Sequence, residues 1–228
     1  MASTDDNVSL MTRYEDQPVL RGLIQLVPFG IGSAVDTALA VRYQTHRADQ
    51  LREFFDELGA GKAHLTPELV ADNDFLHCYF ATVAAVLKSA RAGKVRYLAR
   101  LLRSAVTEEK VSSIDEYEEL LSIINELSYR ELGLLSLLAS HERATPLQPG
   151  EKQLQRARRL WSTFAPEAEK RFGISPAMLQ SILVRLQRSG CYQEITGAYL
   201  DYAGGLGHLT SLYFRLEQIA GDIADVAT

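Results

Sequence analysis

The chain has too few cysteines to build a disulfide scaffold or a cysteine-rich zinc site. Cys78 and Cys191 are the only two, and they lie far apart without metal-ligand spacing. Such sparse cysteine favours a reducing, cytoplasmic compartment. The five histidines are equally scattered and form no i,i+4 pair, so the sequence predicts no metal site.

Basic charge is also in short supply. The 228 residues contain 24 Lys and Arg against 29 Asp and Glu, which gives a formal net charge of −5. This balance excludes a general attraction to nucleic acid, so any anion-binding surface has to be local. Hydrophobic residues make up 46% of the chain, which is enough to build a sizeable core.

Recognisable catalytic motifs are missing. Gly30-x-Gly32 and Gly204-Gly205-x-Gly207 follow no predicted strand and lack the Lys-Ser/Thr ending of a phosphate loop. No HExxH motif and no Ser-His-Asp grouping occurs. His77 lies beside Cys78 on the expected core side of a helix, where it is predicted to be packed. We therefore expect a non-enzyme without a cofactor.

Long apolar runs are absent as well. The most apolar stretch, residues 19–41, contains Arg21, Gln25, Pro28 and Asp36, which are unfavourable in a membrane-spanning helix. The first seven residues are polar and acidic, unlike the start of a secretion signal. We expect a buried helix with a Pro-Gly break in this stretch, and contact with a membrane through residues 19–41 is the disfavoured alternative.

Apolar residues recur at three- and four-residue steps, a pattern that predicts a mainly α-helical chain. Capping Ser, Thr and Asp residues together with Pro and Gly breaks delimit the expected helices. These helices cover residues 19–27, 34–58, 66–92, 94–106, 113–126, 128–141, 151–172, 175–189 and a final stretch after Thr210.

A segment with two prolines and a glycine, residues 142–150, predicts a linker between two domains. We expect a flexible tail at 1–13, a multi-helix bundle at 14–141 and a C-terminal part at 151–228; the helix at 128–141 could belong to either domain. Short alternating runs at 191–195 and 198–202 predict a β-hairpin, and the glycines at 204–207 then break the chain.

The C-terminal segments "LQSILVRLQRSGCYQEI" and "GHLTSLYFRLEQI" resemble the recognition helix, wing and closing helix of bacterial winged-helix modules. The resemblance implies a winged-helix-like α+β part that contains a short β-hairpin. If this part binds DNA, the residues facing a groove are Gln180, Arg185, Gln187 and Arg188. From Phe172 onward, however, three basic residues stand against five acidic ones, which favours protein contact over phosphate contact.

A basic stretch without any acid runs from Phe75 to Thr107. Within it, Arg96, Arg100 and Arg103 share one face of a predicted helix and could bind a phosphate, an acidic segment or a nucleic-acid backbone. Alternatively, these arginines pair internally with the acid-rich run at 108–119. Both interpretations stay open at this point.

A second resemblance concerns "LRGLIQLVPFGIGSAVDTALAVRYQTHRADQLREFFDEL", a short apolar helix, a Pro-x-Gly break and a long helix. Together with "ELSYRELGLLSLLASHE" and the winged-helix-like tail, this arrangement is similar to the abortive-infection alpha family associated with phage defence. Pro28, Gly30, Gly32 and Asp36 carry the match. The resemblance implies a sensor, a regulator or a membrane-acting effector and supplies no catalytic residues.

The sequence thus predicts a non-catalytic bacterial interaction or regulatory protein. Its partner would be another protein, a second copy of the chain or an anionic molecule bound by the arginines at 96, 100 and 103. A winged-helix DNA-binding regulator and a membrane-acting effector are the alternatives.

Overall fold

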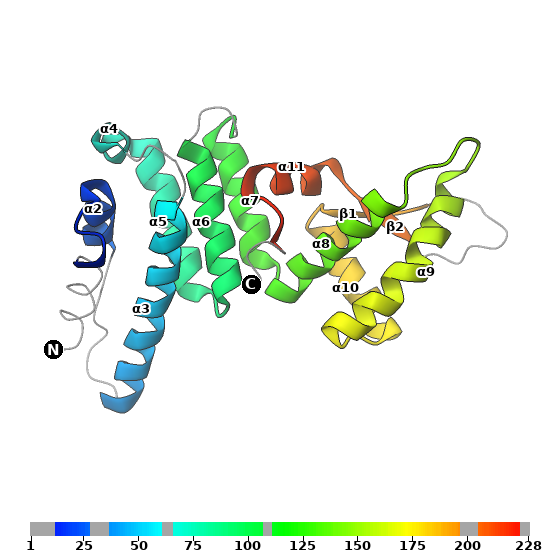
Figure 1. Cartoon of the computed structure of the whole chain (residues 1–228), viewed down its shortest axis with the longest axis horizontal. Helices are drawn as coiled ribbons and strands as arrows, with labels where there is room; N and C mark the ends of the chain where they lie inside the picture. The colour runs from blue at the N-terminus through cyan, green and yellow to red at the C-terminus, as the bar shows by residue number, and fades with distance from the viewer. Residues whose placement is uncertain (1–11, 28–36, 61–65, 107–110, 197–204, 224–228) are drawn as a thin grey trace. The chain divides into compact units, whose positions relative to one another are not determined.

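The computed structural model describes residues 12–27, 37–60, 66–106, 111–196 and 205–223. These residues form ten helices and one two-stranded antiparallel sheet near the C-terminus (Figure 1). The predicted fold class, mainly α with a short C-terminal β-hairpin, is confirmed.

The chain divides into two compact units, which we call the N-terminal unit, residues 1–121, and the C-terminal unit, residues 122–228. The boundary falls inside helix α7 (Ile114–Glu126). The helix expected at 128–141 therefore lies in the C-terminal unit. Residues 145–152 connect it to the next helix of the same unit.

Five further helices build the N-terminal unit. They are α2 (Pro18–Leu26), α3 (Thr37–Ala60), α4 (Pro67–Ala71), α5 (Asn73–Lys88) and α6 (Ala92–Val106). Helix α3 packs along α6, and α5 packs against both (Figure 1). Aromatic side chains fill the space between the helices, and Phe54, Phe55, Tyr79 and Tyr117 are almost completely buried.

The single helix predicted for residues 66–92 is wrong, because the chain forms two separate helices, α4 and α5, within this stretch. The side chain of Thr66 caps α4, whereas Asp72 has an extended backbone and its carboxylate accepts the Phe75 N–H at 2.8 Å. An Asp that caps the following helix interrupts the preceding one, since its side chain replaces the backbone acceptor. Helix α5 then ends at Lys88, and α6 begins at Ala92.

The apolar stretch at 19–41 is described in part. Helix α2 confirms the predicted short helix, and it buries Leu20, Leu23 and Ile24 in the core of the N-terminal unit. The hydroxyl of Tyr79 donates to the Leu23 carbonyl at 2.6 Å, which fixes α2 in place. The four residues that carry the family resemblance, within 28–36, lie outside the described residues.

None of the helices in the described ranges combines the length and the apolar character that crossing a bilayer requires.

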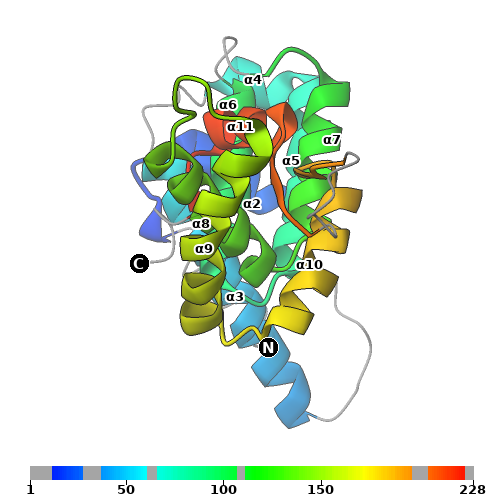
Figure 2. The ribbon, with the colours of Figure 1, turned by 90° about the vertical axis from the view of Figure 1, so that its right-hand side faces the viewer.

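Four helices and the hairpin build the C-terminal unit. They are α8 (Tyr129–Ala144), α9 (Gln153–Phe172), α10 (Pro176–Arg188), β1 (Tyr192–Glu194), β2 (Gly207–Leu209) and α11 (Ser211–Ala220). Helix α8 packs against α9 and β2, and Figure 2 shows α10 leading into the hairpin. The order of three helices, hairpin and closing helix is that of the predicted winged-helix-like part.

Side-chain caps explain where three of the four helices of this unit begin, namely α8, α10 and α11. Ser128 and Glu131 form a capping box at α8, and the hydroxyls of Ser175 and Thr210 accept N–H groups of α10 and α11. All three predicted starts are confirmed. Helix α9 runs through Pro166, which lies on its exposed side.

The hairpin differs from the prediction. Strand β1 pairs with β2 in the register Tyr192↔Leu209 and Glu194↔Gly207, while the expected partner strand at 198–202 lies outside the described residues. Gly207, expected to break the chain, is the first residue of β2. A Cβ there would collide with the Gln193 carbonyl and the Tyr192 ring, so only glycine allows the strands this approach.

Candidate functional site

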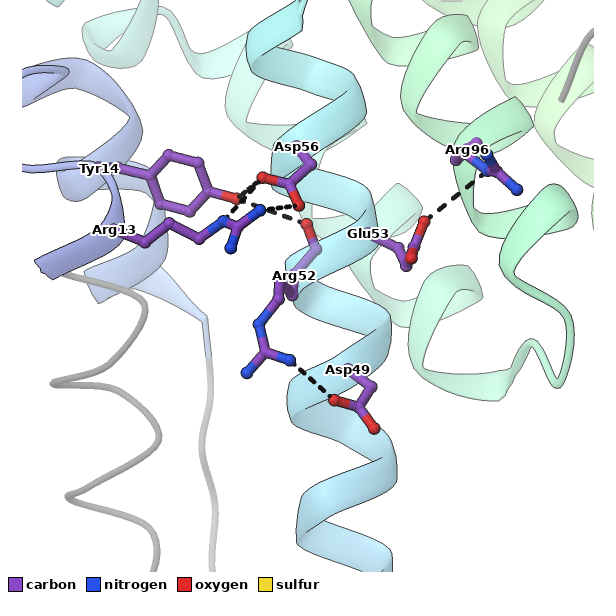
Figure 3. Close-up of polar contacts among 7 residues, drawn as sticks. All are labelled: Arg13, Tyr14, Asp49, Arg52, Glu53, Asp56 and Arg96. Atoms are coloured by element: carbon purple, nitrogen blue, oxygen red, sulfur yellow. Dashed lines mark hydrogen bonds and ion pairs between the residues drawn. The ribbon is translucent and has the colours of Figure 1, made fainter. Parts of the chain in front are cut away.

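The arginine face predicted on α6 points at α3 rather than at solvent. Arg100 Nε lies 2.9 Å from Glu57 Oε1, and Arg103 Nη1 donates to the Glu57 carbonyl at 3.0 Å. Arg96 Nε lies 3.7 Å from Glu53 Oε2, as Figure 3 shows. The partners are thus two glutamates one helical turn apart on α3, which the sequence interpretation did not consider.

The exposure of these groups shows what the pairing does. The side chain of Glu57 is 15% exposed and serves two guanidinium groups, which are themselves only about a quarter exposed. A partly buried carboxylate shared in this way holds two helices together. An anion from solution would have to displace Glu57 before it could reach Arg100 or Arg103, so the geometry favours a structural role.

Other charges of α3 fasten the start of the described chain. Arg13 donates to both carboxylate oxygens of Asp56, at 3.0 and 2.8 Å, and the Tyr14 hydroxyl donates to the same carboxylate at 2.8 Å (Figure 3). Burial, together with this hydrogen bond, raises the pKa of Tyr14. Arg13, the last residue of the predicted tail, is therefore held against α3.

The thiols are poor nucleophiles. Burial, assisted by the nearby carboxylate of Glu118, raises the pKa of Cys78 to about 11, and burial also raises the pKa of Cys191. The prediction that His77 packs into the core is wrong, because its ring is 57% exposed and lies 2.6 Å from Glu118. Adjacent helical residues point in different directions, so Cys78 is buried while His77 is not.

One side of α10 is exposed along the whole length of the helix. Leu179, Ile182, Leu183 and Leu186 face the core, and the remaining residues face solvent. We call this outward side the α10 face; it consists of Ala177, Met178, Gln180, Ser181, Val184, Arg185, Gln187 and Arg188. Met178 and Val184 are 46% and 54% exposed, which places apolar surface beside the basic residues.

All four residues predicted for DNA contact belong to the α10 face, but their surroundings differ. Arg185 Nε lies 3.0 Å from Glu131 Oε1, so this guanidinium is already paired with a buried carboxylate of α8. Gln180 lies close to Gly205 at the edge of the hairpin. Gln187 and Arg188 are exposed, and within the described part of the chain Arg188 has no hydrogen-bond or ion-pair partner.

The division into units changes the charge balance around this face. The C-terminal unit contains 11 Lys and Arg and 11 Asp and Glu, whereas the N-terminal unit contains 13 against 18 and so carries the whole net charge of −5. Helix α10 itself contains no acidic residue. The α10 face is therefore locally basic in an electrically neutral unit.

Two hydrogen bonds, made by Glu142 and Trp161, connect the hairpin to the helices of the same unit, and we call them the hairpin clasp. The carboxylate of Glu142, at the end of α8, accepts the Leu209 N–H at 2.7 Å, and Trp161 Nε1 donates to the Gly207 carbonyl at 3.0 Å. Burial raises the pKa of Glu142, partly opposed by the Leu209 hydrogen bond and by Arg156. A small pocket beside Glu142 is also lined by Gln153 and His208, and no sequence signal marked it.

In comparisons with known proteins, no family model, no curated protein and no solved structure matches the chain significantly.

Proposed function

We propose that this chain is a non-catalytic interaction protein that binds a protein partner through the α10 face. The observation that carries the proposal is the combination of two exposed apolar side chains, Met178 and Val184, with Arg188, which has no partner among the described residues, on one side of a helix. Protein interfaces combine an apolar centre with arginine in this way. In a winged-helix-like unit, the helix before the hairpin is also the usual recognition element.

Two features of the α10 face favour protein over DNA as the partner. Arg185 is held by Glu131, so Arg188 is the one arginine of the face that has no described partner. Non-specific DNA affinity grows with the number of phosphates neutralised, and one or two contacts give little of it. An exposed apolar side chain such as Val184 can be buried against a protein surface, whereas it gains little from contact with the charged backbone of DNA.

Catalysis has little support from the side chains that could perform it. Both thiols are buried and protonated at neutral pH. Within the described ranges, no three His, Cys, Asp or Glu residues come together in a way that could hold a metal ion. These observations support surface recognition as the proposed activity.

Site-specific photo-crosslinking in cells that naturally carry the gene tests the proposal. Val184 is replaced by a photo-crosslinking amino acid, and Leu147, 58% exposed in the connection between α8 and α9, serves as the matched control. We expect one discrete protein adduct from position 184 that disappears when Arg188→Glu is added, and none from position 147. The partner, identified by mass spectrometry and purified, should then bind the wild-type chain directly.

The result against the proposal is equally clear. Equal or diffuse crosslinking from both positions would show that the α10 face is not a recognition surface. The alternative, a DNA-binding regulator, predicts instead that labelled duplex DNA binds at low salt and that Arg188→Glu abolishes this binding. We expect no such binding.

A role in phage defence rests on the family resemblance alone and concerns the biological setting of this interaction. If it holds, deleting the gene should raise the plating efficiency of phages on its host, and a chain with Val184→Asp should fail to restore protection. Unchanged plating across a phage panel would contradict a role in phage defence. The binding proposal would then depend on the crosslinking result alone.

A further inference from the structure

The partner of the α10 face can be specified by its chemistry. Resting on the proposed function, we infer that the face binds an acidic amphipathic helix: a segment with an apolar stripe flanked by Asp or Glu. Three properties of the face lead to this inference, namely its sign, its spacing and its orientation.

The sign of the face is positive because of Arg188, which is exposed and has no partner among the described residues. The charge of Arg185 is largely balanced by Glu131, but its guanidinium is 60% exposed, whereas the carboxylate is 3% exposed beneath it, so an approaching segment meets the donor groups first. With Arg188 one turn away and no acid anywhere on α10, an incoming segment meets positive charge without an opposing acid on this helix.

The spacing of the face suits another helix. Ala177, Ser181, Val184 and Arg188 follow one another at steps of three and four residues and form one stripe along α10, and Met178 flanks this stripe. The small side chains of Ala177 and Ser181 allow a close approach, and the apolar side of a partner helix can cover Val184 while its acidic flank reaches Arg188.

The anchoring of α10 makes the face a prepared surface. Its buried leucines and isoleucine hold one side, Arg185 ties one edge to α8, and Gln180 lies against Gly205 at the other edge. A helix fixed on both edges loses little conformational freedom when a ligand binds, which favours affinity. The small apolar area still limits the affinity of a single helix to about the micromolar range.

Fluorescence anisotropy with a synthetic probe tests the inference on the full chain. The probe is a labelled helical peptide of about four turns, with leucines along one side and glutamates on both flanks. One control peptide has the glutamates replaced by glutamines, and another has the same composition in scrambled order. We expect saturable binding of the acidic probe, at least about tenfold tighter than that of either control.

Protein variants locate the binding. Val184→Asp and Arg188→Glu should each weaken the binding of the acidic probe by about tenfold or more. Their matched controls, Leu147→Asp and Lys170→Glu, make the same changes at exposed positions outside α10 and should leave binding unchanged. Circular dichroism and a thermal melt of each variant confirm that the chain remains folded.

The outcomes separate this inference from the proposed function. Equal binding of the glutamate and glutamine peptides, or no loss with Arg188→Glu, would overturn the acidic-helix inference. If the probe fails but Val184 still crosslinks to one protein, the inference is wrong and the proposed function stands. If neither experiment finds a ligand, both are wrong.

Discussion

The two units use arginine in opposite ways. In the N-terminal unit, Arg100 and Arg103 are about a quarter exposed and share Glu57 of the neighbouring helix. In the C-terminal unit, Arg188 is exposed, has no described partner and lies beside the exposed Val184. A run of basic residues in a sequence therefore does not measure how much positive charge a partner can reach.

The comparison also explains why overall charge is a poor guide to this chain. The N-terminal unit has more basic residues than the C-terminal unit, yet it carries the net charge of −5 and uses arginines to join α3 and α6. The C-terminal unit is neutral, but its α10 contains no acid. Recognition is expected where charge is exposed and unopposed rather than where it is most frequent.

Replacing one buried aromatic residue in each unit should have the largest effect on stability. The pair of variants also tests whether each unit has its own core. Phe54→Ala and Phe164→Ala should each cost about 3–5 kcal/mol, since both rings are completely or almost completely buried. Hydrogen exchange followed by mass spectrometry should show lost protection around α3, α5 and α6 for the first variant and around α8, α9 and α10 for the second. Loss of protection throughout the chain in both variants would contradict two separate cores.

Removing the shared carboxylate of the N-terminal unit should cost less. Glu57→Ala leaves two partly buried guanidinium groups without their acceptor, and we expect a loss of about 1–3 kcal/mol in urea unfolding. Asp49→Ala, which breaks the exposed pair with Arg52, is the matched control and should cost about 0–1 kcal/mol. Equal effects would mean that the α3–α6 pairs contribute no more than surface pairs.

The hairpin clasp should make the stability of the C-terminal unit depend on pH. Burial raises the folded-state pKa of Glu142 above 4.5, so the charged form is disfavoured in the fold. Its contribution is fully present below pH 4.5 and is lost as the pH rises through the raised folded-state value. Glu142→Gln should remove this dependence while still accepting the Leu209 N–H.

Urea unfolding of the wild type and of Glu142→Gln at a series of pH values measures this contribution. The difference between the two proteins should change with pH in favour of the glutamine variant as the pH rises. A difference that stays constant across the series would show that Glu142 does not titrate as its burial indicates.

The thiols should show the smallest effect of all. Because the pKa of Cys78 is raised to about 11, only about one thiol in a thousand is ionised at pH 8. Mass spectrometry after treatment with iodoacetamide should find both cysteines largely unmodified in the folded chain and modified in urea. Rapid labelling of the folded chain would reveal a reactive thiol and support a catalytic function.

Much of the fold was predictable because local signals determine it. The capping box of Ser128, the Ser175-Pro176 start and the cap at Thr210 all mark helices where the structure has them. The strand pairing was not predictable in the same way. In the sequence, Gly207 ends a glycine-rich segment that predicts a break in the chain. In the structure it is the first residue of β2, where the Tyr192 ring leaves no room for a Cβ.

The candidate site was predictable only in part, for a physical reason. Helical spacing placed Arg96, Arg100 and Arg103 on one face correctly, but spacing within one helix does not tell which other helix lies opposite. Glu53 and Glu57, at i,i+4 on α3, were an available signal for that pairing. The exposure of Val184 depends on tertiary packing, and no pattern within α10 alone distinguishes it from a core valine.

The most direct test compares two charge reversals, one in each unit, by urea unfolding. Arg100→Glu places a second acid against Glu57 and should destabilise the chain by about 1–3 kcal/mol, whereas Arg188→Glu should change stability by no more than about 0.5 kcal/mol. That result would establish that the arginine of α6 serves the fold and the arginine of α10 is available to a partner. If Arg188→Glu destabilises the chain as much as Arg100→Glu, or if neither does, the distinction between the two units is wrong.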